Sequence, residues 1–241
     1  MWYTIYVLKE EDRKRECVMN TNPIKRYVKE NYTKLLRFIG DVTEECLYDE
    51  DKLNTTIFDH FGEVLYDLDE GASKKVIIFK ELGFVIKWDD SGDSWREANL
   101  YTEAVYEGLE DFFPFTSHIC EHLNCDWVVQ EIAKPYYSYK KTEMVKRATK
   151  AHIRDEAVEI LFNIFSDIPN CSRLGYPNHL WIAISARFFG LTLMGKLARF
   201  VQKNRINDLH NGNIGFIGDR PVLIDFCGYH WEDDYYYDSD D

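Results

Sequence analysis

The chain has 241 residues, of which 45% are hydrophobic and 15% aromatic, and a chain of this length and composition can bury a substantial core. Its formal net charge of −13 argues against nucleic acid as a partner, because phosphate backbones are bound by basic surfaces. We expect no membrane span, because no apolar stretch reaches about 18 residues, and no signal peptide, because the apolar run at residues 2–8 has no basic lead. The six cysteines lack the spacing of a disulfide framework, which favours reduced thiols and a cytoplasmic protein.

Residues 1–60 are predicted to form a largely helical N-terminal extension. Asn22-Pro23 opens a stretch that runs to about Glu45 and has apolar residues at helical spacing. We expect this helix to pack on a small β-rich unit that follows it. Its apolar positions are Val28, Tyr32, Leu35, Leu36, Phe38 and Ile39.

Two β-rich strands follow at residues 74–79 and 83–88, and a short turn that contains glycine joins them. Lys87 lies at the end of the apolar run Phe84-Val85-Ile86 in the second strand. A lysine in a buried strand needs an anionic partner, because an unpaired buried ammonium group is costly. The alternative is that Lys87 ends the strand and extends into water.

A helix at about residues 94–109 is predicted to supply that anionic partner. Ser94 and Glu97 have the spacing of a capping box at its start. Glu97 also falls on the apolar face of the helix, whereas Glu103 lies toward the edge of that face. We therefore expect Glu97 to form an ion pair with Lys87, and Glu103 is the second candidate.

The next part of the chain is predicted to be one strand followed by helices. An apolar strand begins at Trp127 and runs into Gln130-Glu131, shortly before Pro135. One helix is expected over part of residues 141–165. Another is expected from about residue 179 to residue 203, and it is apolar on most sides and therefore largely buried.

The last predicted elements carry polar residues suited to phosphoryl transfer. Asp208 and Asn213 lie five residues apart on a loop, and Asp225 lies twelve residues after Asn213, at the end of a hairpin. The first Asp can act as a base beside an acceptor hydroxyl, while the Asn and the second Asp can bind Mg²⁺. Phosphoryl transfer from ATP needs this arrangement because it depends mostly on positioning and on neutralising phosphate charge. An ordinary hairpin with a Gly-Asp turn is the alternative.

These segments resemble the protein-kinase-like superfamily. The run Asp208-Leu209-His210-Asn211-Gly212-Asn213 resembles its catalytic loop, and Asp225-Phe226-Cys227-Gly228 resembles its metal-binding loop. The form Asp-x-His-x-x-Asn is similar to the aminoglycoside-phosphotransferase and small bacterial or phage kinase branches. The resemblance implies an α+β, two-lobed fold. A small β-rich N-lobe with its hinge would span 61–133, a mainly helical C-lobe 134–229 and an acidic, Tyr-rich tail 230–241.

The resemblance also implies roles for individual residues. A glycine-rich loop at residues 68–73 would cover the ATP phosphates, Lys87 would contact the α- and β-phosphates, and a hinge would bind the adenine edge through its backbone. The implied ATP-binding residues are Gly71, Ser73, Lys87, Gln130, Glu131 and Ile132. The implied catalytic residues are Asp208, Lys87, Glu97 and His210, with Asn213 and Asp225 as the Mg²⁺ ligands. His210 is expected either near the γ-phosphate or in a hydrogen bond within the loop.

The sequence departs from the family pattern at three places. Asp69 stands where the first glycine of the phosphate loop is expected, and Ile206 replaces a histidine two residues before Asp208. The short stretch after Gly228 leaves no room for a long activation segment, so we expect other parts, such as residues 136–178, to form the acceptor site.

The sequence therefore predicts an ATP- and Mg²⁺-dependent phosphotransferase that moves the γ-phosphate to a hydroxyl of a protein or a small molecule. The negative net charge favours a cationic acceptor. The alternative is a pseudokinase-type module that binds a nucleotide or a partner without catalysis, and Asp69 and the short C-terminal stretch favour it.

Overall fold

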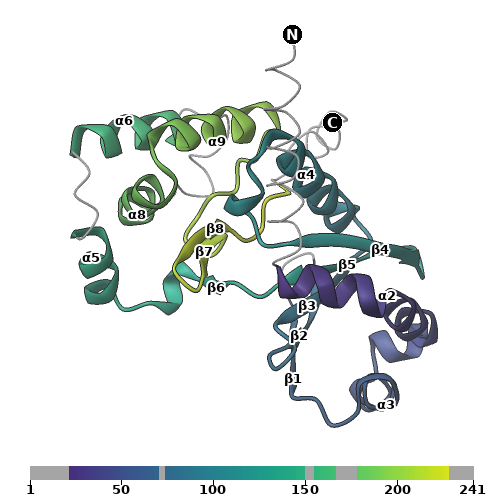
Figure 1. The fold of residues 1–241 in the computed structure, drawn as a ribbon. Helices are drawn as coiled ribbons and strands as arrows, with labels where there is room; N and C mark the ends of the chain where they lie inside the picture. The colour runs from purple at the N-terminus through teal and green to yellow at the C-terminus, as the bar shows by residue number, and fades with distance from the viewer. Residues whose placement is uncertain (1–21, 71–73, 150–154, 167–177, 228–241) are drawn as a thin grey trace, which may run out of the picture. The chain divides into compact units, whose positions relative to one another are not determined.

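The computed structural model describes residues 22–70, 74–149, 155–166 and 178–227 (Figure 1). The chain divides into two compact units. We call Met1–Trp95 with Phe115–Glu131 the sheet unit, and Arg96–Pro114 with Ile132–Asp241 the helical unit. The first contains an antiparallel sheet and the second is mainly helical, which confirms the predicted α+β fold.

The sheet unit is built around a five-stranded antiparallel sheet with the strand order β1-β2-β3-β5-β4. Its central strand, β3, is buried at every position, as the apolar run before Lys87 predicts. Lys87 itself lies opposite Val76 of β2 and Val128 of β5. The strands are β1 (Tyr66–Glu70), β2 (Lys75–Phe79), β3 (Phe84–Asp89), β4 (Thr116–His122) and β5 (Cys125–Glu131).

Helix α2 (Pro23–Asp41) covers part of this sheet and confirms the predicted N-terminal helix. It begins at Pro23 because the side chain of Asn22 accepts hydrogen bonds from the backbone N–H groups of Ile24 and Lys25. The helix contacts β4 and β5. The Tyr32 hydroxyl donates to the backbone carbonyl of Ile119 on β4, at 3.0 Å.

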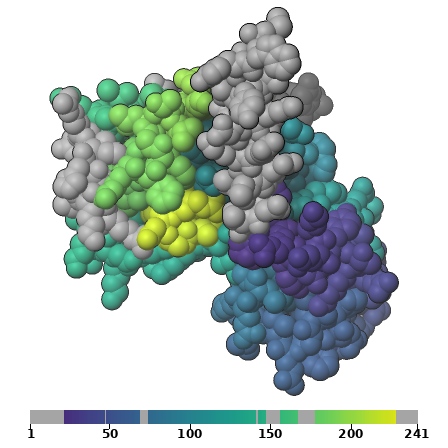
Figure 2. Space-filling model, in the orientation of Figure 1, coloured from purple at the N-terminus to yellow at the C-terminus, as the bar shows by residue number. Residues whose placement is uncertain are grey.

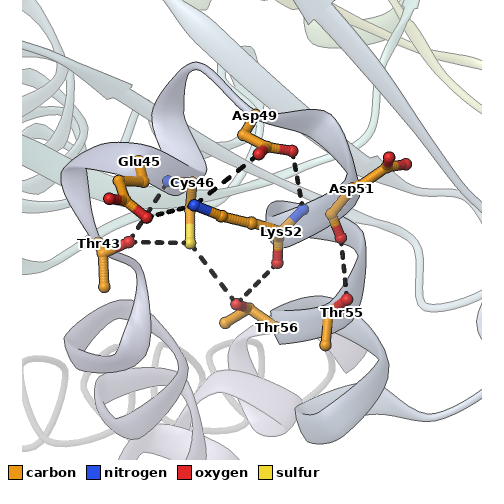
Figure 3. A network of polar contacts seen from close by, with 8 residues as sticks. All are labelled: Thr43, Glu45, Cys46, Asp49, Asp51, Lys52, Thr55 and Thr56. Carbon is orange, nitrogen blue, oxygen red and sulfur yellow. Dashed lines mark hydrogen bonds and ion pairs between the residues drawn. The ribbon is translucent and has the colours of Figure 1, made fainter.

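A polar network joins the short 3₁₀ helix η1 (Glu44–Leu47) to helix α3 (Glu50–Phe61) (Figure 3). The Sγ atom of Cys46 lies 3.2 Å from Oγ1 of Thr43 and 3.8 Å from Oγ1 of Thr56. Lys52 forms an ion pair with Glu45 beside them. Burial raises the pKa of the Cys46 thiol, but its hydrogen bonds with Thr43 and Thr56 and the charge of Lys52 outweigh burial, so that this pKa lies below its ordinary value.

The helical unit packs helices against a small sheet with the order β6-β7-β8. Helices α6, α8 and α9 contact one another, α5 contacts α8, and α8 also contacts β8 (Figure 1). In Figure 2 the yellow part of the chain, which contains the β7–β8 hairpin, reaches the surface beside the green helices. The elements are α4 (Asp93–Glu107), η2 (Glu110–Phe112), β6 (Lys134–Pro135), η3 (Tyr136–Ser138), α5 (Lys141–Thr149), α6 (Asp155–Ser166), α8 (His179–Phe189), α9 (Leu191–Lys203), β7 (Ile214–Ile217) and β8 (Arg220–Leu223).

The long helix expected at residues 179–203 is divided into α8 and α9 at Gly190. Gly190 has φ +82°, a backbone conformation that glycine adopts at little cost, and its N–H donates to the carbonyl of Ala186. The apolar pattern continues on both sides of this glycine, and for that reason it suggested one helix. Within the described ranges, no helix combines the length and the hydrophobicity that crossing a bilayer requires.

Candidate active site

The N-terminus of α4 is capped by Asp89, which ends strand β3. Its Oδ1 accepts from the backbone N–H groups of Ser91 (3.1 Å) and Asp93 (2.9 Å), and its Oδ2 accepts from that of Ser94 (2.8 Å). The predicted capping box is therefore wrong: Ser94 lies inside the first turn, and its hydroxyl has no hydrogen-bond partner among the described residues. A carboxylate suits this place because the helix N-terminus is positively polarised. Capping thus does not account for Glu97.

Glu97 is fully buried, and its carboxylate reaches the predicted metal-binding loop. Its Oε1 accepts from the backbone N–H of Phe226 at 3.4 Å, within the helical unit. Phe226 is also fully buried, and its ring lies 4.7 Å from that of Phe113. Buried carboxylates require hydrogen-bond donors, and this contact supplies one. Glu97 therefore attaches α4 directly to the loop that carries Asp225.

Two other acidic residues of α4, Glu103 and Glu107, are engaged at the surface of the helical unit. Lys203, at the end of α9, lies 2.5 Å from Oε1 of Glu103 and 3.0 Å from Oε1 of Glu107, and these hydrogen bonds raise the pKa of Lys203. Arg96 donates to the backbone carbonyl of Asn204 at 3.0 Å. Glu103, the second candidate partner of Lys87, pairs with Lys203 at the end of α9, just before the predicted catalytic loop.

The predicted catalytic loop is fixed by buried apolar residues on both sides of Asp208. Ile206 and Leu209 are fully buried in the core of the helical unit, whereas Asp208 and His210 are partly exposed. Nδ1 of His210 accepts from the backbone N–H of Gly212 at 2.8 Å, which places the ring proton on Nε2 when the imidazole is neutral. That Nε2 lies 3.4 Å from Oδ1 of Asp208. His210 is therefore hydrogen-bonded within the loop and faces the predicted base.

Asn213 connects the catalytic loop to the hairpin that ends at the predicted metal carboxylate. Its Nδ2 donates to the backbone carbonyl of Asp208 at 3.0 Å. Its own backbone carbonyl accepts from the N–H of Ile224 at 2.7 Å, just beyond the paired ends of β7 and β8. The hairpin therefore brings Asn213 and Asp225 to the same end, although twelve positions separate them in sequence.

Gly215 lets this hairpin lie close to its neighbours. A Cβ atom at this position would lie 2.3 Å from the backbone oxygen of Lys134 on β6, so only glycine fits without movement of the backbone. The backbone carbonyl of Gly215 accepts from Nε1 of the buried Trp181 on α8, at 3.2 Å. The sequence shows a glycine here, but its neighbours appear only in the structure.

The residue types at the open end of the hairpin fit a magnesium ion that is shared with phosphates. Mg²⁺ prefers oxygen ligands and is usually held by one or two carboxylates together with substrate phosphates and water. Asp225 offers a carboxylate, and Asn213 offers an amide oxygen because its amide nitrogen is turned toward Asp208. Among the described residues, no group of three or more His, Cys, Asp and Glu side chains could hold a metal ion.

Two of the predicted ATP-binding residues, Gly71 and Ser73, lie outside the described residues. Lys87 is buried on β3, as predicted for a lysine that needs an anionic partner. It belongs to the sheet unit and Glu97 to the helical unit, so that their ion pair stays a prediction.

The side chains of Gln130 and Glu131, two of the three predicted hinge residues, form hydrogen bonds within the sheet unit. Nε2 of Gln130 donates to Oγ1 of Thr116 at 3.0 Å. The Glu131 carboxylate accepts from Nδ2 of Asn22 at 3.0 Å and from the backbone N–H of Phe115 at 3.2 Å. The backbone N–H of Glu131 donates to the carbonyl of Phe115 at 2.8 Å. The predicted adenine contact of residues 130–132 therefore depends on their remaining backbone groups, and it too stays a prediction.

Comparisons with known proteins give similarity at the level of structure only. No protein-family model and no curated protein matches the chain. Aminoglycoside phosphotransferase APH(3″)-Id from Streptomyces rimosus has 13% sequence identity and a TM-score of 0.37, over 74% of this chain and 77% of that one. APH(2″)-IIa, in a ternary complex with streptomycin and ATP, has 17% identity and a TM-score of 0.29, over 78% of this chain and 72% of that one.

The structural neighbours are aminoglycoside phosphotransferases. Both scores and both identities are low, and we therefore base the proposed function on the residues of this chain.

Proposed function

We propose that this protein is a phosphotransferase that moves the γ-phosphate of ATP to a hydroxyl group, with Mg²⁺ as cofactor. The observation that carries the proposal is the position of Asn213. Its side chain holds the backbone of Asp208, and its backbone holds Ile224, next to Asp225. A base and two oxygen ligands for a cation are thereby connected through one residue, and such positioning is what phosphoryl transfer requires.

The residues of the helical unit have distinct tasks in this reaction. Asp208 orients the acceptor hydroxyl and accepts its proton, and Nε2 of His210 lies 3.4 Å from Oδ1 of this carboxylate. Asn213 and Asp225 would hold Mg²⁺, which neutralises phosphate charge when it is bound. Glu97 holds the loop that carries Asp225 through the N–H of Phe226.

The sheet unit would supply the contacts to the nucleotide. Lys87 is assigned to the α- and β-phosphates, and its buried place on β3 supports this role, because a buried ammonium group needs anionic neighbours. Residues 130–132 are assigned to the adenine edge. The acceptor is a hydroxyl on a protein or a small molecule, and the net charge of −13 favours a cationic one.

Thermal unfolding with and without MgATP tests the nucleotide site. A ligand present at about a hundred times its Kd stabilises the folded state by about 2.7 kcal/mol, which raises the Tm of a chain of this size by roughly 5–11 °C. We expect this shift in the wild type and its loss in Asp225→Ala and Lys87→Ala. The matched controls are Asp219→Ala, in the turn at the other end of the same hairpin, and Lys80→Ala, in the exposed turn after β2, and both should keep the shift.

Labelled ATP then tests transfer to cationic and neutral acceptors with hydroxyl groups. Asp208→Ala should bind MgATP normally and lose transfer, because the base does not contribute to nucleotide binding. Absence of any shift in the wild type at millimolar MgATP would disprove the enzyme assignment. A shift without transfer to any acceptor would favour a module that binds nucleotide without catalysis.

A further inference from the structure

Cys227 lies two residues after Asp225 and has no role in the reaction as proposed. Its side chain is buried, and its Sγ lies 3.4 Å from Oδ1 of Asp225. A thiol is a weak hydrogen-bond donor, and an ionised carboxylate can only accept. The proton of this contact therefore belongs to the sulfur, which donates to the carboxylate assigned to Mg²⁺.

The residue between these two fixes the backbone from which both side chains extend. Phe226 is fully buried and its ring packs on Phe113, while its N–H donates to the buried Glu97. With Phe226 held at both its ring and its amide, rotation of the loop is restricted. The thiol of Cys227 and the carboxylate of Asp225 are therefore held in place by the core of the helical unit.

A neutral donor is chemically suited to such a position. A carboxylate has about four lone-pair sites, so accepting one S–H leaves capacity for a cation. A lysine or arginine at the same place would offset the negative charge that attracts the metal, whereas a thiol leaves that charge in place. Outer hydrogen bonds of this kind orient metal ligands and affect affinity.

We propose that Cys227 is a positioning residue that orients the Asp225 carboxylate toward the metal ion by donating its S–H. The inference rests on the proposed function, because that function makes Asp225 a metal ligand. It adds to that function a positioning role for Cys227, the cysteine of the Asp-Phe-Cys-Gly segment.

The test uses Mn²⁺ as a spectroscopic substitute for Mg²⁺, together with a non-hydrolysable ATP analogue. Free Mn²⁺ is measured by electron paramagnetic resonance in the presence of the full chain. We expect Cys227→Ala to weaken Mn²⁺ affinity about tenfold, the lower end of the range for loss of an outer hydrogen bond to a metal ligand. Cys227→Ser keeps a donor and should retain most of the affinity. Cys120→Ala, on β4 of the sheet unit, is the matched control and should bind like the wild type.

The outcomes separate this inference from the proposed function. Wild-type protein that binds no Mn²⁺ with the analogue would disprove both, and binding that survives in Asp225→Ala would disprove the metal assignment. If the wild type binds and Cys227→Ala binds equally well, the positioning role is overturned. It is also overturned if serine is as poor as alanine, because the thiol would then act through packing. Should Cys227→Ala fail to fold, Cys227→Val fills the site without a donor, and its comparison with serine decides.

Discussion

The side chain of Glu97 has two roles, a hydrogen bond and a predicted ion pair, and substitutions can test them separately. The structure shows its Oε1 accepting from the N–H of Phe226, for which any acceptor oxygen would serve. The predicted ion pair with Lys87 requires in addition a negative charge. Glu97→Gln keeps an acceptor oxygen and removes the charge, whereas Glu97→Ala removes both.

The loss of stability expected for Glu97→Ala follows from the burial of the hydrogen bond that it removes. Both Glu97 and Phe226 are fully buried, so alanine leaves a backbone N–H without a partner in the core, at a cost of about 1–3 kcal/mol. The N–O distance of 3.4 Å is long for a hydrogen bond and places the cost toward the lower end. For a chain of this size, a loss of about 1–2 kcal/mol lowers Tm by roughly 2–8 °C. Glutamine should melt close to the wild type.

Thermal unfolding without ligand measures the first role, and titration with MgATP measures the second. We expect the alanine variant to melt lower and both variants to bind MgATP more weakly. Glu103→Gln on the same helix is the control, because its exposed pair with Lys203 contributes little. If alanine and glutamine melt together, the hydrogen bond to Phe226 does not stabilise the loop. If glutamine binds MgATP like the wild type, the ion pair with Lys87 is wrong.

Two further predictions concern the supports of the site, and a third concerns the Cys46 network of the sheet unit. Gly215→Ala would place a Cβ atom 2.3 Å from a backbone oxygen and should lower the free energy of unfolding in urea by about 1–3 kcal/mol. Gly195→Ala, in α9 with nothing within 4 Å, is the control and should raise it by about 0.5–1 kcal/mol. Equal effects of the two substitutions would contradict the close approach of Gly215 to the backbone of Lys134. Asp89→Ala should cost about 0.5–2 kcal/mol through loss of the α4 cap, and Asp89→Asn, which keeps one of the two acceptor oxygens, should cost less; unchanged stability in Asp89→Ala would show that the cap is unimportant. Folding lowers the pKa of Cys46, so the wild type should have a higher Tm than Cys46→Ser as pH rises toward the ordinary thiol pKa of 9.0. This difference in Tm should disappear as pH falls below the pKa of Cys46 in the folded state. A difference in Tm that does not depend on pH would disprove the shift.

The sequence was most informative where a pattern is local. The strand that carries Lys87 and the hairpin between Asn213 and Asp225 follow from apolar runs bounded by turn residues, and both are present. The position of Glu97 on the apolar face of α4 was also readable, and the side chain is buried. Periodicity reports which side of an element faces the core, and these features depend on little else.

The sequence was least informative about contacts that depend on the tertiary fold. The bond between Glu97 and Phe226 joins residues 129 positions apart, and no local pattern encodes it. Asp89 caps α4 from the end of the preceding strand, whereas the spacing of Ser94 and Glu97 suggested a cap inside the helix. The break at Gly190 was missed because its backbone conformation cannot be read from an apolar pattern.

The division of the chain between its two units limits how the protein can be made and cut. Arg96–Pro114 belongs to the helical unit but lies between two stretches of the sheet unit, Met1–Trp95 and Phe115–Glu131. During translation, α4 therefore emerges before the helices against which its Leu100 and Ala104 pack. The sheet in turn stays incomplete until β5, which lies between β3 and β4, has been synthesised. No cleavage at one peptide bond releases two whole units, so separate expression of either unit requires a gene that joins the two segments of that unit directly.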